Sequence, residues 1–213
     1  MIGIREYSSG DIEAVRQICS ETGFLGNSIE NIIDYKDLFI DLDINYFLND
    51  KNTCIYVATD REKVVGYVIL TPDIMRYKKL STKYYIYRVF LDVIRFRLFR
   101  KKEYMYYVRL FIYYLKGEFT LPEFDEYPAI LHINVAPGHQ GRGIGKMLFD
   151  AMFECLRKFN SPGIQLQTTS ANENSVGFFK KFGFEELASK ETSFYKPYGF
   201  NAVRLIVMGK KFC

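Results

Sequence analysis

Residues 135–146 constrain the fold of this chain more than any other segment. They read Val-Ala-Pro-Gly-His-Gln-Gly-Arg-Gly-Ile-Gly-Lys and run directly into residues 144–159, where apolar side chains recur every three or four positions. This spacing predicts an amphipathic helix with one buried face. The glycines therefore lie at the first turn of a helix, where unpaired N–H groups and the helix dipole favour a bound anion.

Two common phosphate-binding patterns do not fit this segment. A P-loop needs Ser or Thr after its Gly-Lys pair, but Met147 follows Lys146, and Gln140 stands where the first glycine belongs. A dinucleotide fingerprint that starts at Gly141 needs glycine or alanine at position 146, which is lysine. The sequence therefore favours neither of these two folds.

Residues 140–145, Gln-Gly-Arg-Gly-Ile-Gly after an apolar strand, resemble the pyrophosphate loop of the GCN5-related N-acetyltransferases (GNAT). Residues 172–184 have the form and spacing of that family's other acetyl-CoA motif. The resemblance covers residues 129–186 well, the first 70 residues and the closing strands more loosely, and residues 76–116 not at all. It implies one α/β domain over residues 1–213, with a mixed, mostly antiparallel sheet flanked by helices. Residues 76–116, which the resemblance does not cover, are interpreted as a helical insertion between strands 3 and 4.

The resemblance implies acetyl-CoA as the cofactor. Main-chain groups of the central strand would bind the pantetheine arm in a gap between two splayed strands. The glycine-rich turn would take the pyrophosphate, with Arg142 and Lys146 adding charge. Asn172 matches a family asparagine near the arm, although an N-cap role in its own helix fits equally well. The implied cofactor-binding residues are Ile133, Asn134, Val135, Gln140, Gly141, Arg142, Gly143, Ile144, Gly145, Lys146, Asn172, Ser175 and Phe179.

One position departs from the family pattern. The helix residue that is usually a tyrosine, the proton donor to the departing thiolate, is Phe179 here. Ser175, Tyr195 and Tyr198 are candidate proton donors in place of this tyrosine. Alternatively, the thiolate leaves without a proton donor, since a thiol pKa of about 8.5 makes the thiolate a fair leaving group. His132 on the central strand is a candidate general base, with a hydrogen-bonded core histidine as the alternative.

The resemblance implies an N-acetyltransferase that moves an acetyl group from acetyl-CoA to an amine of a small molecule or peptide. A catalytically weak acyl-CoA-binding regulatory module and an interaction protein using the insertion are the alternatives. In this family the first two helices commonly frame the acceptor site. The acidic residues of 29–48 are therefore candidates for holding the amine, against a solvated helix face: Asp34, Asp37, Asp41 and Asp43.

The insertion concentrates the basic charge of the chain. Residues 76–116 hold twelve Lys or Arg against Asp92 and Glu103, a local balance of +10, which leaves −6 for the rest of a chain whose net charge is +4. Interleaved aromatic residues predict two helices parted near residues 100–102. We consider a packed hairpin with basic heads in water, a lid over the acceptor side, and a membrane-surface contact. No nucleic-acid module is recognisable, and a homodimer stays open.

Cysteine usage and hydropathy bear on location. Cys19, Cys54, Cys155 and Cys213 form no close pair in the sequence, and they predict reduced thiols of a cytoplasmic protein without a structural zinc or other metal site. There is no leader-like start and no run of 18 apolar residues, so we expect neither secretion nor a membrane span.

Local patterns predict the remaining elements. Helices are expected over 12–22, with Gly23 at the C′ position, over 29–48, and after a capping box at Ser170 to Glu173. Strands are expected over 2–7, 53–59 and 64–71, 129–135, 164–169, 184–191 and 200–210.

Overall fold

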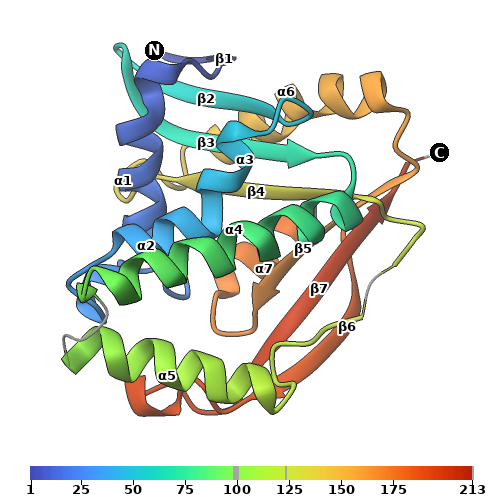
Figure 1. Cartoon of the computed structure of the whole chain (residues 1–213). Coiled ribbons are helices and arrows are strands. Elements are labelled where there is room, and N and C mark those ends of the chain that lie inside the picture. Colours follow the sequence, from blue (N-terminus) through green and yellow to red (C-terminus); the bar gives the residue numbers. More distant parts are fainter. Residues whose placement is uncertain (98–100, 123, 213) are drawn as a thin grey trace.

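The computed structural model describes residues 1–97, 101–122 and 124–212. Seven strands of this described part form one sheet in the order β1-β2-β3-β4-β5-β7-β6 (Figure 1). All neighbours pair antiparallel except β4 and β5, which are parallel. The predicted mixed, mostly antiparallel sheet is confirmed. Its strands are β1 (Ile2–Glu6), β2 (Cys54–Asp60), β3 (Lys63–Thr71), β4 (Ala129–Val135), β5 (Gly163–Thr169), β6 (Glu185–Thr192) and β7 (Val203–Lys211).

Helices cover both faces of this sheet. Strand β3 is buried on both sides: Val68 and Leu70 pack with the core under α6 and α7, while Tyr67 and Ile69 pack with α1 and the segment that follows it. This alternation is the period of two of a strand between two layers. The helices are α1 (Ile12–Thr22), α2 (Asp37–Ile40), α3 (Tyr46–Asn49), α4 (Ile74–Ile94), α5 (Lys101–Leu115), α6 (Ile144–Phe159) and α7 (Glu173–Lys181).

Helices α1 and α6 have the predicted boundaries, and Gly23 directly follows α1, but without the left-handed conformation that is common for glycine at a helix end. Its φ is −73°, so it ends α1 without a left-handed residue. A Cβ at this position would overlap the ring of Phe39. Glycine is therefore required here by the close packing of the following segment, a tertiary contact that local sequence rules do not contain.

The single helix predicted for residues 29–48 is wrong, because the segment is broken into short turns. A 3-10 turn at Ile29–Asn31 precedes α2, and a π-helical turn at Asp41–Asn45 separates α2 from α3. The acidic side chains that interrupt the apolar pattern take part in tertiary contacts: Arg16 donates to Asp37 at 2.9 Å and to Asp41 at 2.5 Å. Such π turns are often found at functional sites.

Residues 76–116 form the predicted pair of helices, α4 and α5. The expected break near residues 100–102 begins earlier, because α4 ends at Ile94; Arg100 lies outside the described residues. A buried ion network attaches the hairpin to the domain, since Arg88 contacts Asp41 at 2.7 Å and Asp92 at 2.9 Å. The expectation that the basic charge of the insertion faces the opening or solvent is therefore wrong for Arg88.

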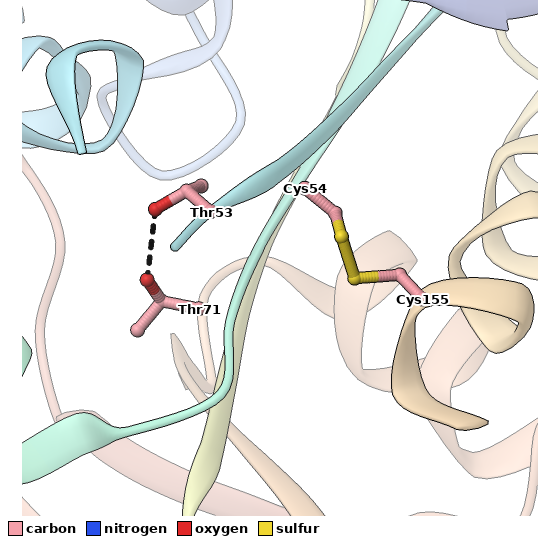
Figure 2. The surroundings of a disulfide bond; sticks show 4 residues. All are labelled: Thr53, Cys54, Thr71 and Cys155. Atoms are coloured by element: carbon pink, nitrogen blue, oxygen red, sulfur yellow. Dashed lines mark hydrogen bonds between the residues drawn. A yellow bond between two sulfur atoms is a disulfide. The ribbon is translucent and has the colours of Figure 1, made fainter. Parts of the chain in front are cut away.

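Cys54 and Cys155 form a disulfide that joins β2 to α6, with their Cα atoms 6.3 Å apart (Figure 2). Beside it, the hydroxyls of Thr53 and Thr71 are hydrogen bonded at 3.0 Å. The prediction of reduced thiols is wrong for this pair. The two residues are 101 positions apart in sequence, so only the packing of α6 on β2 brings them together. Cys19 is a free, buried thiol, and Cys213 lies outside the described residues.

Among the described residues, no helix has the length and apolar character needed to cross a bilayer.

Candidate active site

The central feature of the site is the place where β4 and β5 part. They pair only at Ala129 with Ile164 and at Ile130 with Gln165. Farther on, β4 stays paired with β3 up to Val135, and β5 stays paired with β7 up to Thr169. Because the two strands diverge here, the edge of β4 that faces β5 has no strand partner from residue 131 onward. This is the splayed pair that the family resemblance implied.

A cavity of about 200 Å³ opens at this parting. It is lined by both strands, by the start of α7, and by the segment that follows α1. No described residue of α4 or α5 lines it, so the insertion is not a direct cover of this cavity. Seven of the residues that we predicted for the site lie in its wall: His132, Ile133, Asn134, Asn172, Ser175, Phe179 and Tyr195.

The glycine-rich turn lies at the start of α6. Gly141 and Gly143 have φ values of 75° and 78°, a left-handed conformation that favours glycine, and a Cβ at either position would meet nothing within 4 Å. The first helical bond runs from the N–H of Met147 to the carbonyl of Gly143 at 3.1 Å, so the amides before it have no helical acceptor. The turn thus has open space beside unpaired donors, as an anion site requires.

Neighbouring residues hold this turn in place. Gln140 Nε2 donates to the carbonyl of Val135 at 3.2 Å, and the side chain of Ile144 is buried in the core. Gly145 has a different role from the other glycines, because a Cβ there would lie 3.0 Å from the ring of Phe178. Because Gly145 has no side chain, α6 can pack closely against α7 at this position.

The two basic residues of the turn already face carboxylates. Lys146 Nζ lies 2.6 Å from Asp150, and Arg142 lies 3.5 Å from Asp60. Both pairs are exposed to solvent, where such contacts contribute little to stability. Their positive charges therefore lie near the turn, where they could contact a bound anion. In this structure no buried residue fixes the direction of either side chain.

Asn172 has the N-cap role that the sequence allowed. Its Oδ1 accepts a hydrogen bond from the N–H of Ser175 at 3.2 Å. The predicted capping box at Ser170 is wrong, because the Ser170 hydroxyl accepts from the N–H of Arg204 at 2.9 Å instead. The hydroxyl of Ser175 accepts from Thr168 at 3.1 Å, which leaves its own hydrogen for an acceptor in the cavity.

The candidate donors differ in position. Phe179 is buried among aromatic rings of the core and also lines the cavity. Burial raises the pKa of Tyr195 to about 12, so this phenol is protonated at neutral pH. Tyr198 does not line the cavity; its ring lies 5.3 Å from the Arg109 guanidinium on α5. Ser175 and Tyr195 therefore remain as candidates, and the position of Tyr198 argues against it.

His132 lies on the strand face that it shares with Asn134, as the alternation along β4 predicts. Its Nε2 lies 2.9 Å from Asn134 Nδ2, which also donates to the hydroxyl of Tyr67 at 2.9 Å. The imidazole is half-buried and also lines the cavity. It is therefore both hydrogen bonded, as the core alternative expected, and open to the site, as a general base requires.

Asp43 is the one acidic residue of the four candidates that reaches this cavity. Asp37 and Asp41 bind Arg16, and Asp34 binds Lys102 at 2.9 Å. The Asp43 carboxylate accepts from the Cys19 thiol at 3.2 Å and lies 3.7 Å from His132 Nε2. Burial first, and then the Asp43 charge, raise the pKa of Cys19 well above its usual value, so the thiol keeps its proton. The sequence contains four candidate aspartates in this region. Only the structure, in which the predicted helix is divided into short turns, shows that Asp43 is the one that lines the cavity.

A mixed sheet that parts between two parallel strands, followed by a glycine turn that opens a helix, is the architecture of the acyl-CoA-dependent N-acyltransferases. The chain belongs to the acetyltransferase (GNAT) family, whose family model matches residues 14–184. Members of this family use acetyl-CoA as the acetyl donor.

Solved structures share this fold over the full length of the chain. The crystal structure of SsHAT is 24% identical with a TM-score of 0.73, and the match covers 99% of this chain and 98% of that one. A ribosomal-protein-alanine N-acetyltransferase from Brucella melitensis is 18% identical with a TM-score of 0.59 and 99% coverage of both chains. A GCN5-related N-acetyltransferase from Kribbella flavida is 15% identical, with a TM-score of 0.61 and coverage of 99% and 98%. At these identities the similarity establishes the fold.

The first prediction tests the anion site with an isosteric pair at Gly143. Asn and Asp both tolerate the left-handed conformation, so Gly143→Asn and Gly143→Asp introduce similar strain and similar bulk and differ in charge. We expect the aspartate variant to bind CoA at least about tenfold more weakly than the asparagine variant, because a carboxylate would repel phosphate at the helix N-terminus. Calorimetry with CoA measures the difference, and equal affinities in two folded variants would rule out pyrophosphate binding here.

Proposed function

We propose that this chain is an N-acetyltransferase that transfers the acetyl group of acetyl-CoA to the amine of a small molecule or a peptide. The observation that carries the proposal is the parting of β4 and β5 over a cavity whose wall holds the hydroxyl residues Ser175 and Tyr195 together with Asp43 and His132. The bound cofactor would supply the acetyl group as an activated thioester.

The protein groups that would hold the cofactor fit its chemistry. The unpaired edge of β4 at residues 131–135 offers main-chain donors and acceptors to an extended amide-containing arm, as an added strand would. The open left-handed glycines let a pyrophosphate approach the amides at the start of α6. Asn172 and Ser175 line the cavity at the parting of the strands.

The acceptor side has the groups that an amine needs. An ammonium group would be bound by the carboxylate of Asp43, which lines the cavity. To react, this group must lose a proton, and two groups that can accept one lie close together: the Asp43 carboxylate and the imidazole of His132, whose Nε2 is 3.7 Å from that carboxylate. Asn134 fixes the position of the imidazole by a contact of 2.9 Å. We therefore assign Asp43 to amine binding and His132 to proton removal.

The leaving-group side has hydroxyls in place of the usual tyrosine. Ser175 has a hydrogen available, and Tyr195 remains protonated because its pKa is about 12. Since a thiol has a pKa of about 8.5, a phenol of higher pKa would stabilise a thiolate by donating a hydrogen bond and would not give up its proton completely. Tyr195 is therefore assigned to charge stabilisation.

A catalytically weak acyl-CoA-binding module is the second candidate function, favoured by Phe179. Acetyl-CoA hydrolysis and transfer to a panel of amines separate the two functions, since the module would bind CoA without turnover. A homodimer and a cytoplasmic location stay predictions from the sequence, and the Cys54–Cys155 disulfide is a feature more typical of oxidising compartments.

Tyr195 and Tyr198 form a matched pair for testing the hydroxyl assignment. We expect Tyr195→Phe to lower kcat by about a hundredfold, within the usual range for a lost catalytic proton donor or hydrogen bond. Tyr198→Phe removes the same atom outside the cavity and should leave kcat nearly unchanged. If both variants turn over like the parent protein, the thiolate leaves without help from Tyr195, and Phe179→Tyr would then be expected to raise the rate.

The acidic residues of the same region offer a second matched pair. Asp43→Asn should raise KM for the acceptor amine by about ten- to a hundredfold, because a hydrogen bond to a charged group contributes about 1.5 to 3 kcal/mol. Asp37→Asn, a neutralisation outside the cavity wall, should not change this KM. CoA affinity should be the same in both variants. An unchanged KM in Asp43→Asn would remove this residue from the acceptor site.

A further inference from the structure

The C-terminal half of α4 has an inverted distribution of side chains. Its buried face carries charges, since Arg88 is 9% exposed and Asp92 is fully buried. Its outer face is apolar: Ile86, Phe90 and Ile94, spaced by four residues, are 64%, 60% and 55% exposed. An ordinary surface helix buries its apolar stripe and exposes its charges. The C-terminal half of α4 therefore exposes a stripe of apolar side chains on its outer face.

Helix α5 repeats this arrangement. Glu103 is fully buried and accepts hydrogen bonds from the N–H groups of Asp34 and Tyr35 at 2.8 and 2.7 Å. The outer residues recur at intervals of three and four and are at least about one third exposed. They are Tyr104, Met105, Val108, Phe111, Ile112 and Leu115.

Buried charges fix this orientation of the hairpin. Arg88 lies between Asp41 and Asp92, and Asp41 is also bound by Arg16 of α1. The hydroxyl of Tyr35 donates to Asp92 at 3.3 Å and completes the network. Rotating α4 to bury Phe90 would break these contacts and leave charges unpaired. The outward direction of the apolar stripe is thus enforced by the fold of the domain itself.

The exposed charges of the hairpin have one sign. In the described part of residues 74–116, the only acidic side chains are Asp92 and Glu103, and both are buried. The surface therefore combines apolar side chains with positive charge. The exposed charged residues are Arg76, Lys79, Lys83, Arg95, Arg97, Lys102 and Lys116.

We propose that the outer face of the α4–α5 hairpin binds the surface of an anionic lipid bilayer. The apolar stripes would enter the boundary between headgroups and acyl chains, and the lysines and arginines would contact anionic headgroups. A second copy of the chain is a poorer occupant, because a symmetric contact would bring like charges together. Nucleic acid is also a poorer fit, since six of the nine outer residues named above are aliphatic and provide no stacking surface for bases.

Vesicle flotation of the purified chain tests the proposal. We expect binding to vesicles of phosphatidylcholine with phosphatidylglycerol, and much weaker binding to phosphatidylcholine alone. Replacing Lys79, Lys83 and Arg95 by alanine should lower the affinity on the order of a hundredfold, about fivefold for each charge. The matched control replaces Lys158, Lys180 and Lys181, which are exposed on α6 and α7, and should bind like the parent protein.

The apolar stripe is tested separately by fluorescence. The chain has no tryptophan, so a single introduced indole reports on one position only. In Phe90→Trp we expect a blue shift when anionic vesicles are added, and quenching by brominated acyl chains. Phe159→Trp places the probe at a residue that is 40% exposed at the end of α6 and should show neither effect.

Several outcomes would overturn the proposal. These are absence of flotation with any vesicle, equal binding of the Lys79, Lys83 and Arg95 variant and its control, or an unshifted spectrum in Phe90→Trp. Concentration-dependent dimerisation that is lost in Phe90→Ser, without vesicle binding, would instead assign the face to a second copy. Binding to DNA or heparin that is unaffected by Phe90→Ser would assign it to a polyanion.

Discussion

The site depends on one feature of the sheet: β4 and β5 diverge after two residue pairs, while each stays paired with its other neighbour. The two strands share only two residue pairs before β4 continues along β3 and β5 continues along β7. An unpaired strand edge in a folded core must be satisfied by water or a ligand. The cavity at the parting, and the residues of α7 and the segment after α1 that close it, follow from this geometry.

Local patterns predicted those parts of the fold that depend on local interactions. Helix α6 was predicted from residue 144 to 159 because its apolar period is regular and glycines precede it, and α1 was predicted over 12–22 for the same kind of reason. The spacing of the glycines in residues 140–145 indicates the turn without any knowledge of the fold. The family resemblance supplied the splayed strands, which residue patterns alone do not indicate.

Features that depend on distant contacts were not predicted. The disulfide joins residues 101 positions apart, and Gly23 is required by the ring of Phe39. Four acids between residues 34 and 43 look alike in the sequence, and only their tertiary partners separate Asp43 from the others. Arg88 belongs to a basic run that suggested solvent exposure, yet two carboxylates bind it inside the protein. A charge whose partner comes from another segment cannot be placed by composition.

The most direct measurement of the central claim is hydrogen–deuterium exchange with and without acetyl-CoA. If the edge of β4 and the turn before α6 receive the cofactor, exchange should slow in peptides covering residues 131–135 and 141–146, because their amides gain acceptors. Peptides from α4 and α5 should be unaffected, since no described residue of these helices lines the cavity. Protection confined to the hairpin, or none at saturating acetyl-CoA, would contradict the account.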